Sequence, residues 1–244
     1  IGDTILFSHV LTRFVELTTP GEPVTLLLRE DGAKVSFLFP NEVNILSINF
    51  KKLAKNLMYR KKIMKMLFDN NYRMVISTDY HRHPNLDESL IKACQAPQNV
   101  AMVSRPWAKY QTNLDNNSKY FSRLINSGPL IKDKILRWVD FSNELLGENR
   151  SPPLAVKKDT SLSERQTDRR SCIILNPFSA VRAKQSPLAL FKELIATLPI
   201  ESQIIITGTP SDLKKNQEFK SLLNQENVEF DCSSFSIIQN RILN

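Results

Sequence analysis

The chain has 244 residues, of which 41% are hydrophobic and 24% are charged, and its formal net charge is +8. These globular proportions exclude disordered and fibrous classes, and at about 100–200 residues per domain the length allows one large domain or two small ones. No apolar run approaches the roughly 18–20 residues that a membrane-spanning helix needs, so we expect none. The positive charge points to a partner that carries negative charge.

The N-terminal half predicts strands that alternate with helices. Residues 1–17 repeat apolar side chains at steps of three and four and predict a helix. Further apolar runs predict strands over Val24–Leu28, Lys34–Phe39, Met74–Thr78 and Asn99–Val103. Helical periodicity predicts helices over 50–69, Leu86–Ala96 and Ile131–Leu146. This alternation is typical of a parallel α/β sheet.

The C-terminal half begins after a change of character. Residues 148–170 contain two prolines, many charges and little apolar periodicity, and they predict an interdomain linker. Beyond it we expect strands over Cys172–Leu175, Gln203–Thr207 and Val228–Asp231, with a helix capped by Ser186 and another ending near Leu223. The prediction is therefore an N-terminal Rossmann-like domain over 1–147, a linker over 148–170, and the first part of a C-terminal domain over 171–244. Two doubly wound domains of this kind would face a cleft.

The three cysteines, Cys94, Cys172 and Cys232, lie far apart and have no partner at metal-ligand spacing. A disulfide scaffold and a zinc module are therefore not expected, and a reducing compartment fits best. The chain starts with Ile1, at what resembles the second half of a strand–turn–helix unit, and stops in an apolar stretch without a helix stop signal. We expect it to be a fragment of a longer protein.

Polar side chains follow several predicted strands, and ligands of open α/β sheets bind at such carboxyl ends. Near the start of the chain, Asp3 follows Gly2 and either caps its helix or serves as a general base. In the loop after residue 175, Ser179 can donate a hydrogen bond and Lys184 can neutralise a phosphate near a helix N-terminus. The alternative for this loop is an ordinary solvated connection.

The turn Gly208-Thr209-Pro210-Ser211-Asp212 offers a third strand end. Its glycine could approach a nucleoside closely, with Asp212 bonding the ribose hydroxyls, or Asp212 could simply cap the next helix. Another polar group, His81-Arg82-His83, suggests acceptor contact or an ordinary polar loop. Two histidines without further ligands are insufficient for zinc, so no metal site is expected.

Residues 51–65 form a strongly basic segment without any Asp or Glu. The segment is either a solvated helix face or a surface for anionic lipid or an acidic glycolipid acceptor. Its cations are Lys51, Lys52, Lys55, Arg60, Lys61, Lys62 and Lys65.

Four segments resemble, in order, glycosyltransferase family nine, the ADP-heptose:lipopolysaccharide heptosyltransferase family. GDTILFSHVL resembles its Gly-Asp opening, and RMVISTDYHRHPNLDESLIKACQAPQNVAMVSR resembles its D-x-V-I-D strand with the following helix and strand. NPFSAVRAKQSPLALFKELIATLP resembles its P-x-x-S-x-x-K-x-W-P-x-x-x-F-x-x-L segment, and IIITGTPSD resembles its strand and glycine turn. The chain departs from the family at Gln185-Ser186, where a tryptophan is usual, and it lacks the later Asp-Thr-Gly…His signature.

The resemblance implies a GT-B fold and inverting, metal-independent transfer of a sugar, with ADP-heptose the favoured donor and a lipopolysaccharide-type or other glycan the acceptor. Asp3 would match the catalytic base, Lys184 the donor-phosphate lysine and Ser179 the hydroxyl residue beside it. The resemblance implies no cofactor and a cytoplasmic location with peripheral contact at the inner membrane. The alternatives are an inactive nucleotide-sugar-binding homologue and a basic nucleic-acid-binding protein, which no nucleic-acid motif supports.

Overall fold

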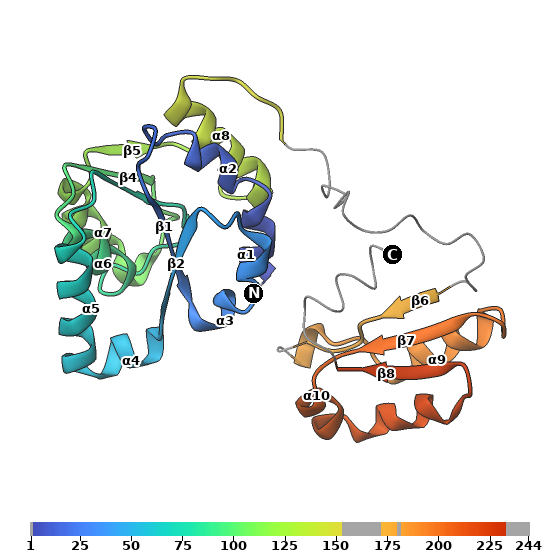
Figure 1. Cartoon of the computed structure of the whole chain (residues 1–244). Helices are drawn as coiled ribbons and strands as arrows, with labels where there is room; N and C mark the ends of the chain where they lie inside the picture. Colours follow the sequence, from blue (N-terminus) through green and yellow to red (C-terminus); the bar gives the residue numbers. More distant parts are fainter. Residues whose placement is uncertain (1, 153–171, 180–181, 233–244) are drawn as a thin grey trace. The chain divides into compact units, whose positions relative to one another are not determined.

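The computed structural model describes residues 2–152, 172–179 and 182–232 (Figure 1). The chain divides into two compact units, Ile1–Val156 and Lys157–Asn244, hereafter the N-terminal and C-terminal units. The predicted linker over 148–170 lies mainly outside the described residues, so its boundaries stay a prediction. No helix in the described ranges is long and apolar enough to cross a membrane.

The described part of the N-terminal unit, residues 2–152, contains five strands in two parallel sheets. One sheet pairs β1 (Val24–Arg29) with β2 (Val43–Ile48), with Val24 opposite Val43. The other has the order β3-β4-β5, formed by Met74–Ser77, Gln98–Met102 and Arg123–Ile125. The predictions for β1, β3 and β4 are confirmed, whereas β2 and β5 were not predicted.

Helices cover both sheets of this unit. The helices are α1 (Gly2–Ser8), α2 (Leu11–Val15), α3 (Glu30–Ala33), α4 (Phe50–Lys55), α5 (Leu57–Asp69), α6 (Asp87–Cys94), α7 (Gln111–Asn117) and α8 (Lys134–Leu146), with 3-10 turns η1 (Ser36–Leu38), η2 (Ala108–Tyr110) and η3 (Ser118–Tyr120). The single N-terminal helix that we predicted is thus two short helices, α1 and α2. The predictions for α6 and α8 are confirmed, with boundaries shifted by one to three residues.

The predicted strand over Lys34–Phe39 is wrong, because this segment instead completes α3 and forms η1. Val35 and Phe39 are buried while Phe37 between them is 46% exposed. Val35 and Phe39 flank η1 as its N-cap and C-cap, so this turn brings both apolar side chains to the core. The short apolar pattern of the segment did not indicate this turn.

The predicted helix over 50–69 is divided at Asn56. Its backbone is extended (φ −114°, ψ 106°), and its side chain accepts a hydrogen bond from the Tyr59 backbone N–H at 2.9 Å. Asn56 therefore ends α4 and caps α5 at the same position. Of the apolar side chains in this segment, Leu53 and Leu67 are buried but Leu57 is 66% exposed.

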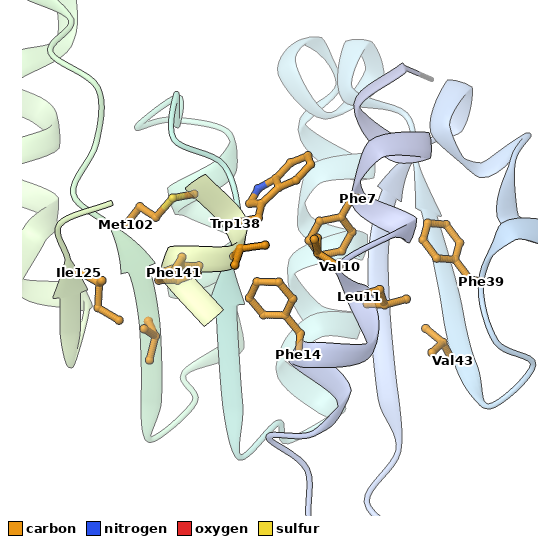
Figure 2. Packing of buried hydrophobic residues seen from close by; sticks show 12 residues of the cluster. Phe7, Val10, Leu11, Phe14, Phe39, Val43, Met102, Ile125, Trp138 and Phe141 are labelled. Atoms are coloured by element: carbon orange, nitrogen blue, oxygen red, sulfur yellow. The ribbon is translucent and has the colours of Figure 1, made fainter. Parts of the chain in front are cut away.

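An aromatic cluster holds α1, α2 and α8 against one face of the sheets (Figure 2). Phe7 of α1 packs edge-on against Trp138 of α8, with ring centroids 5.1 Å apart, and Phe14 of α2 lies 6.0 Å from Phe141. These rings contact strand residues such as Met102. Because the cluster joins α1 to α8, it also brings the two helix N-termini close together.

In the described residues of the C-terminal unit, β6 (Cys172–Leu175), β7 (Gln203–Thr207) and β8 (Val228–Asp231) form a parallel sheet of order β6-β7-β8. All three strands were predicted. Helix α9 (Leu188–Thr197) packs on the sheet through Phe191 and Ile195, and α10 (Pro210–Lys215) is followed by the 3-10 helix η5 (Gln217–Asn224). The predicted Ser186 cap is wrong by one residue, because Pro187 occupies the N-cap position. The helix predicted to run to Leu223 breaks at Asn216.

Candidate functional site

Asp3 lies in the first turn of α1 and forms an ion pair with the first residue of α8. Lys134 Nζ is 2.6 Å from Asp3 Oδ2, and the same ammonium lies 5.6 Å from the Trp138 ring centroid. The Asp3 side chain is 73% exposed. This geometry gives an accessible carboxylate that a fixed cation orients, which suits a group that accepts a proton from a bound hydroxyl.

Asp79 is a second carboxylate at this site, which the sequence reading did not select. It lies two residues beyond β3, on the accessible surface. Desolvation by the surrounding protein raises the pKa of its carboxyl, Lys134 opposes that shift, and Asp3 adds to it. Asp3 and Asp79 therefore share one lysine. The only sequence signal for Asp79 was its position at the carboxyl end of a buried strand.

Arg82 does not face an acceptor, contrary to our prediction. Its side chain is 3% exposed, and Nε donates to Glu88 Oε1 at 2.9 Å. A second guanidinium nitrogen donates to the Met102 carbonyl, and the group lies 4.9 Å from the Phe121 ring centroid. Burial and these contacts assign Arg82 a structural role. The arginine ties the loop after β3 to β4 and α6.

The two neighbouring histidines instead join an aromatic group at the ends of β3 and β4. The ring of His81 lies 4.1 Å from that of Trp107, and His83 lies 4.7 Å from Tyr110. Trp107 and Tyr110 contact each other edge to face at 4.5 Å. Aromatic surfaces of this kind can pack against the apolar face of a sugar ring. Trp107 and Tyr110 were missed because the segment around η2 has no apolar periodicity.

A backbone hydrogen bond joins His83 to Asp87, and the pKa values of both side chains are shifted. Desolvation, with smaller effects of Lys109 and His81, lowers the pKa of the His83 imidazole. The His83 backbone N–H donates to Asp87 Oδ2 at 2.6 Å. Desolvation raises the pKa of the Asp87 carboxyl to about 6, although this hydrogen bond opposes the rise. In the folded chain, the surroundings therefore favour the neutral form of the His83 imidazole and of the Asp87 carboxyl.

The basic segment lies on α4 and α5, and two of its seven cations have partners. Arg60 donates to the Asn85 carbonyl at 2.8 Å, and Lys65 pairs with Asp69 at 2.9 Å. No ion pair to a described residue involves the remaining five, all exposed, which are Lys51, Lys52, Lys55, Lys61 and Lys62. The charge of this surface is therefore largely uncompensated.

In the C-terminal unit, Ser179 and Lys184 lie between β6 and α9. Lys184 ends the 3-10 turn η4 (Arg182–Lys184) and is exposed, and Ser179 is partly buried. The backbone N–H groups of the first turn of α9 follow directly. An exposed ammonium before a helix N-terminus is a favourable arrangement for a phosphate group.

The turn after β7 has a structural explanation. Gly208 lies so close to Phe178 that a Cβ atom would come within 2.6 Å of its ring. Thr209 and Asp212 form a capping box: Asp212 Oδ2 accepts from the Thr209 N–H at 2.9 Å, and Thr209 Oγ1 accepts from the Asp212 N–H at 3.1 Å. The capping role is shown, and donor binding by these three residues remains a prediction.

No group of three or more His, Cys, Asp or Glu side chains within the described ranges could hold a metal ion.

No known protein-family profile matches the sequence, and no curated protein matches it. Solved structures do match. E. coli heptosyltransferase WaaC with ADP-2-deoxy-2-fluoro heptose has a TM-score of 0.69 and 17% identity, over 99% of this chain and 76% of that chain. WaaC with ADP has a TM-score of 0.67 and 14% identity, over 98% and 75%. A family 9 glycosyl transferase from Veillonella parvula has a TM-score of 0.67 and 15% identity, over 96% and 67%.

The chain has the GT-B fold. The predicted fold class is therefore confirmed. In the terms of this fold, Asp3 and the aromatic group belong to the first α/β unit, and Lys184 and the capping box belong to the second. The likeness extends over nearly the whole chain, although fewer than one residue in five is identical.

Proposed function

We propose that this chain is a family nine glycosyltransferase that transfers a sugar, heptose being favoured, from a nucleotide-sugar to a lipopolysaccharide-type or other glycan acceptor. The observation that carries the proposal is the fold likeness, over 99% of the chain, to a heptosyltransferase solved with an ADP-heptose analogue. The Gly-Asp opening and the Ser179–Lys184 loop, which resemble that family's motifs, support it independently. We place the reaction at the cytoplasmic face of the inner membrane, as the family resemblance implies.

In the proposed reaction, Asp3 accepts the proton of the acceptor hydroxyl while the hydroxyl oxygen attacks the anomeric carbon of the donor sugar. Lys134 orients the Asp3 carboxylate through their 2.6 Å ion pair. Attack from the face opposite the leaving group inverts the anomeric configuration. The charge of Lys134 also acts on the Asp79 carboxyl, where it opposes the rise in pKa that desolvation causes.

The bond that breaks joins the anomeric carbon to a diphosphate oxygen, and negative charge grows on the leaving nucleoside diphosphate. The Lys184 ammonium, the N-terminal N–H groups of α9 and the Ser179 hydroxyl are the groups that stabilise this charge. Preorganised donors and cations of this kind can replace a metal ion. The proposed reaction is accordingly metal-independent and needs no cofactor.

The test is transfer of heptose from ADP-heptose to a lipopolysaccharide-core acceptor by the wild-type chain and by Asp3→Asn. Loss of the base should lower the transfer rate about 10²–10⁴-fold, with donor affinity retained. Asp115→Asn, an exposed carboxylate on α7, is the matched control. Wild-type transfer by Asp3→Asn would remove Asp3 from the mechanism. Donor binding without any transfer by the wild-type chain would favour a non-catalytic homologue.

A further inference from the structure

Helix α5 exposes large apolar side chains on the face that points away from the core. Leu57 is 66% exposed, Met58 74% and Phe68 51%. Ile63 and Leu67 on the other face are buried and hold the helix against the N-terminal unit. Leu57 and Phe68 are eleven residues apart, about three helical turns, so they lie along one line of the helix surface. Helix α5 thus has two apolar faces, and only one is used for folding.

The exposed apolar side chains lie among uncompensated cations. Lys61 and Lys62 follow Leu57 and Met58 by one helical turn, so they project on the same side of α5. On α4, Lys51, Lys52 and Lys55 are exposed as well. None of these five lysines has an ion-pair partner among the residues that the structure describes. The pattern differs from an ordinary solvated face, where apolar side chains are scattered singly.

The break at Asn56 places the two apolar residues at a corner. Helix α4 ends at Lys55 and α5 begins at Leu57, so Leu57 and Met58 occupy the first turn of α5, where the two helices meet (Figure 1). The Asn56 side chain caps α5 through the Tyr59 N–H, and the Tyr59 hydroxyl accepts from the Asn49 N–H at 3.0 Å. These two hydrogen bonds hold the corner in place, and they leave the Leu57 and Met58 side chains exposed to solvent.

We propose that the α4–α5 corner is a docking surface for an anionic lipid bilayer, with Leu57 and Met58 inserted at the acyl boundary and the five lysines on the lipid phosphates. Charge complementarity selects an anionic partner. The apolar side chains select a bilayer over a soluble polyanion, because only the bilayer offers them an apolar phase. The proposal goes beyond sugar transfer and depends neither on the donor nor on Asp3.

The experiment measures co-sedimentation of the full chain with vesicles of phosphatidylcholine, with and without a minor fraction of phosphatidylglycerol. We expect binding only to the anionic vesicles. Lys61→Gln/Lys62→Gln should weaken it about 10–30-fold, and Leu57→Ser/Met58→Ser about tenfold. Matched controls are Ile131→Ser, an apolar side chain that is 93% exposed elsewhere, and Lys214→Gln/Lys215→Gln on α10, which should bind as the wild type does.

Three results would overturn the proposal. The first is failure of the wild-type chain to bind anionic vesicles. The second is unchanged binding by Leu57→Ser/Met58→Ser, which would reduce the interaction to adsorption by charge. The third is full displacement from vesicles by a soluble acidic oligosaccharide, which would assign the surface to the acceptor glycan. Since all substituted side chains are exposed, unchanged circular dichroism is expected throughout, and a transfer assay on a soluble acceptor separates this proposal from the proposed function.

Discussion

Arg82 and Glu88 form a buried ion pair that makes further hydrogen bonds to neighbouring elements. Arg82 donates to Glu88 and to the Met102 carbonyl, and Glu88 Oε2 accepts from Asn117 Nδ2 at 2.8 Å. The pair therefore joins the loop after β3 to β4, α6 and α7. At the residue scale, it shows that an arginine between two histidines can belong to the interior.

Removal of one partner from this pair should be costly, because it leaves an uncompensated buried charge. We expect Glu88→Ala to lower the free energy of unfolding by about 3–5 kcal/mol in urea titrations. The exposed pair Lys65–Asp69 provides the control, and Asp69→Ala should change stability by less than about 1 kcal/mol. Retained stability of Arg82→Ala, together with weakened acceptor binding, would restore the acceptor role that we predicted for Arg82.

Asp87 should make stability depend on pH in an unusual direction. Its pKa is raised from 3.8 to about 6 in the folded chain, so the folded state binds the proton more tightly than the unfolded state. This contribution is complete below pH 3.8 and is lost as pH rises through about 6. It amounts to on the order of 3 kcal/mol, at about 1.36 kcal/mol for each pKa unit.

The measurement is urea unfolding of the wild type and of Asp87→Asn over this pH range. The lowered pKa of His83 acts oppositely, since its contribution is lost as pH falls, but it is present in both proteins. The stability difference between them should therefore isolate Asp87. A difference that does not vary with pH would show that the Asp87 carboxyl is not perturbed.

The sequence predicted the candidate site only where a residue type and a motif coincided. Asp3 and Lys184 were selected because each follows a strand end within a family-like segment. Asp79 and Trp107 were not, because their roles arise from neighbours distant in the chain: Lys134 and Asp3 for the former, and two histidines for the latter. Local pattern contains no information on such contacts.

At the element scale, the turn between β7 and α10 depends on the absence of a side chain at Gly208. A Cβ there would lie 2.6 Å from Phe178 Cδ2 and 3.3 Å from Phe230 Cε2, and both rings belong to the core of the unit. We expect Gly208→Ala to destabilise the chain by about 1–3 kcal/mol, as overpacking does.

Thermal unfolding and ADP titration together test this role. Gly2→Ala, where a Cβ would meet no atom within 4 Å, is the stability control and should unfold as the wild type does. Unchanged stability of Gly208→Ala with weakened ADP binding would instead favour the predicted contact between this turn and the donor.

Elements were predictable where one residue period extended over the whole element. The Ile204–Ile206 core of β7 and the apolar run of β6 were identified, and so was α8 with its Gly147 terminator. The short β5, with three residues, and the polar-interrupted β2 were not. The helix breaks at Asn56 and Asn216 were also missed, because an asparagine within a helical period is a weak signal compared with proline or glycine.

At the scale of the whole molecule, alternation of strands and helices was sufficient to predict two α/β units, and the structural likeness confirms the fold class. Pairing order and register depend on long-range packing and were not predictable. The net charge of +8 is likewise a property whose location only the structure shows. Five of the cations without an ion-pair partner among the described residues gather on α4 and α5.

The sheet of β1 and β2 has a consequence for hydrogen exchange in the chain. Leu26, Leu27 and Leu28 of β1 are half-buried, whereas Ile204 and Ile206 in central β7 are fully buried. Elements with fewer buried apolar side chains open at a lower free energy. The backbone amides of β1 should therefore exchange with deuterium faster than those of β7 under native conditions.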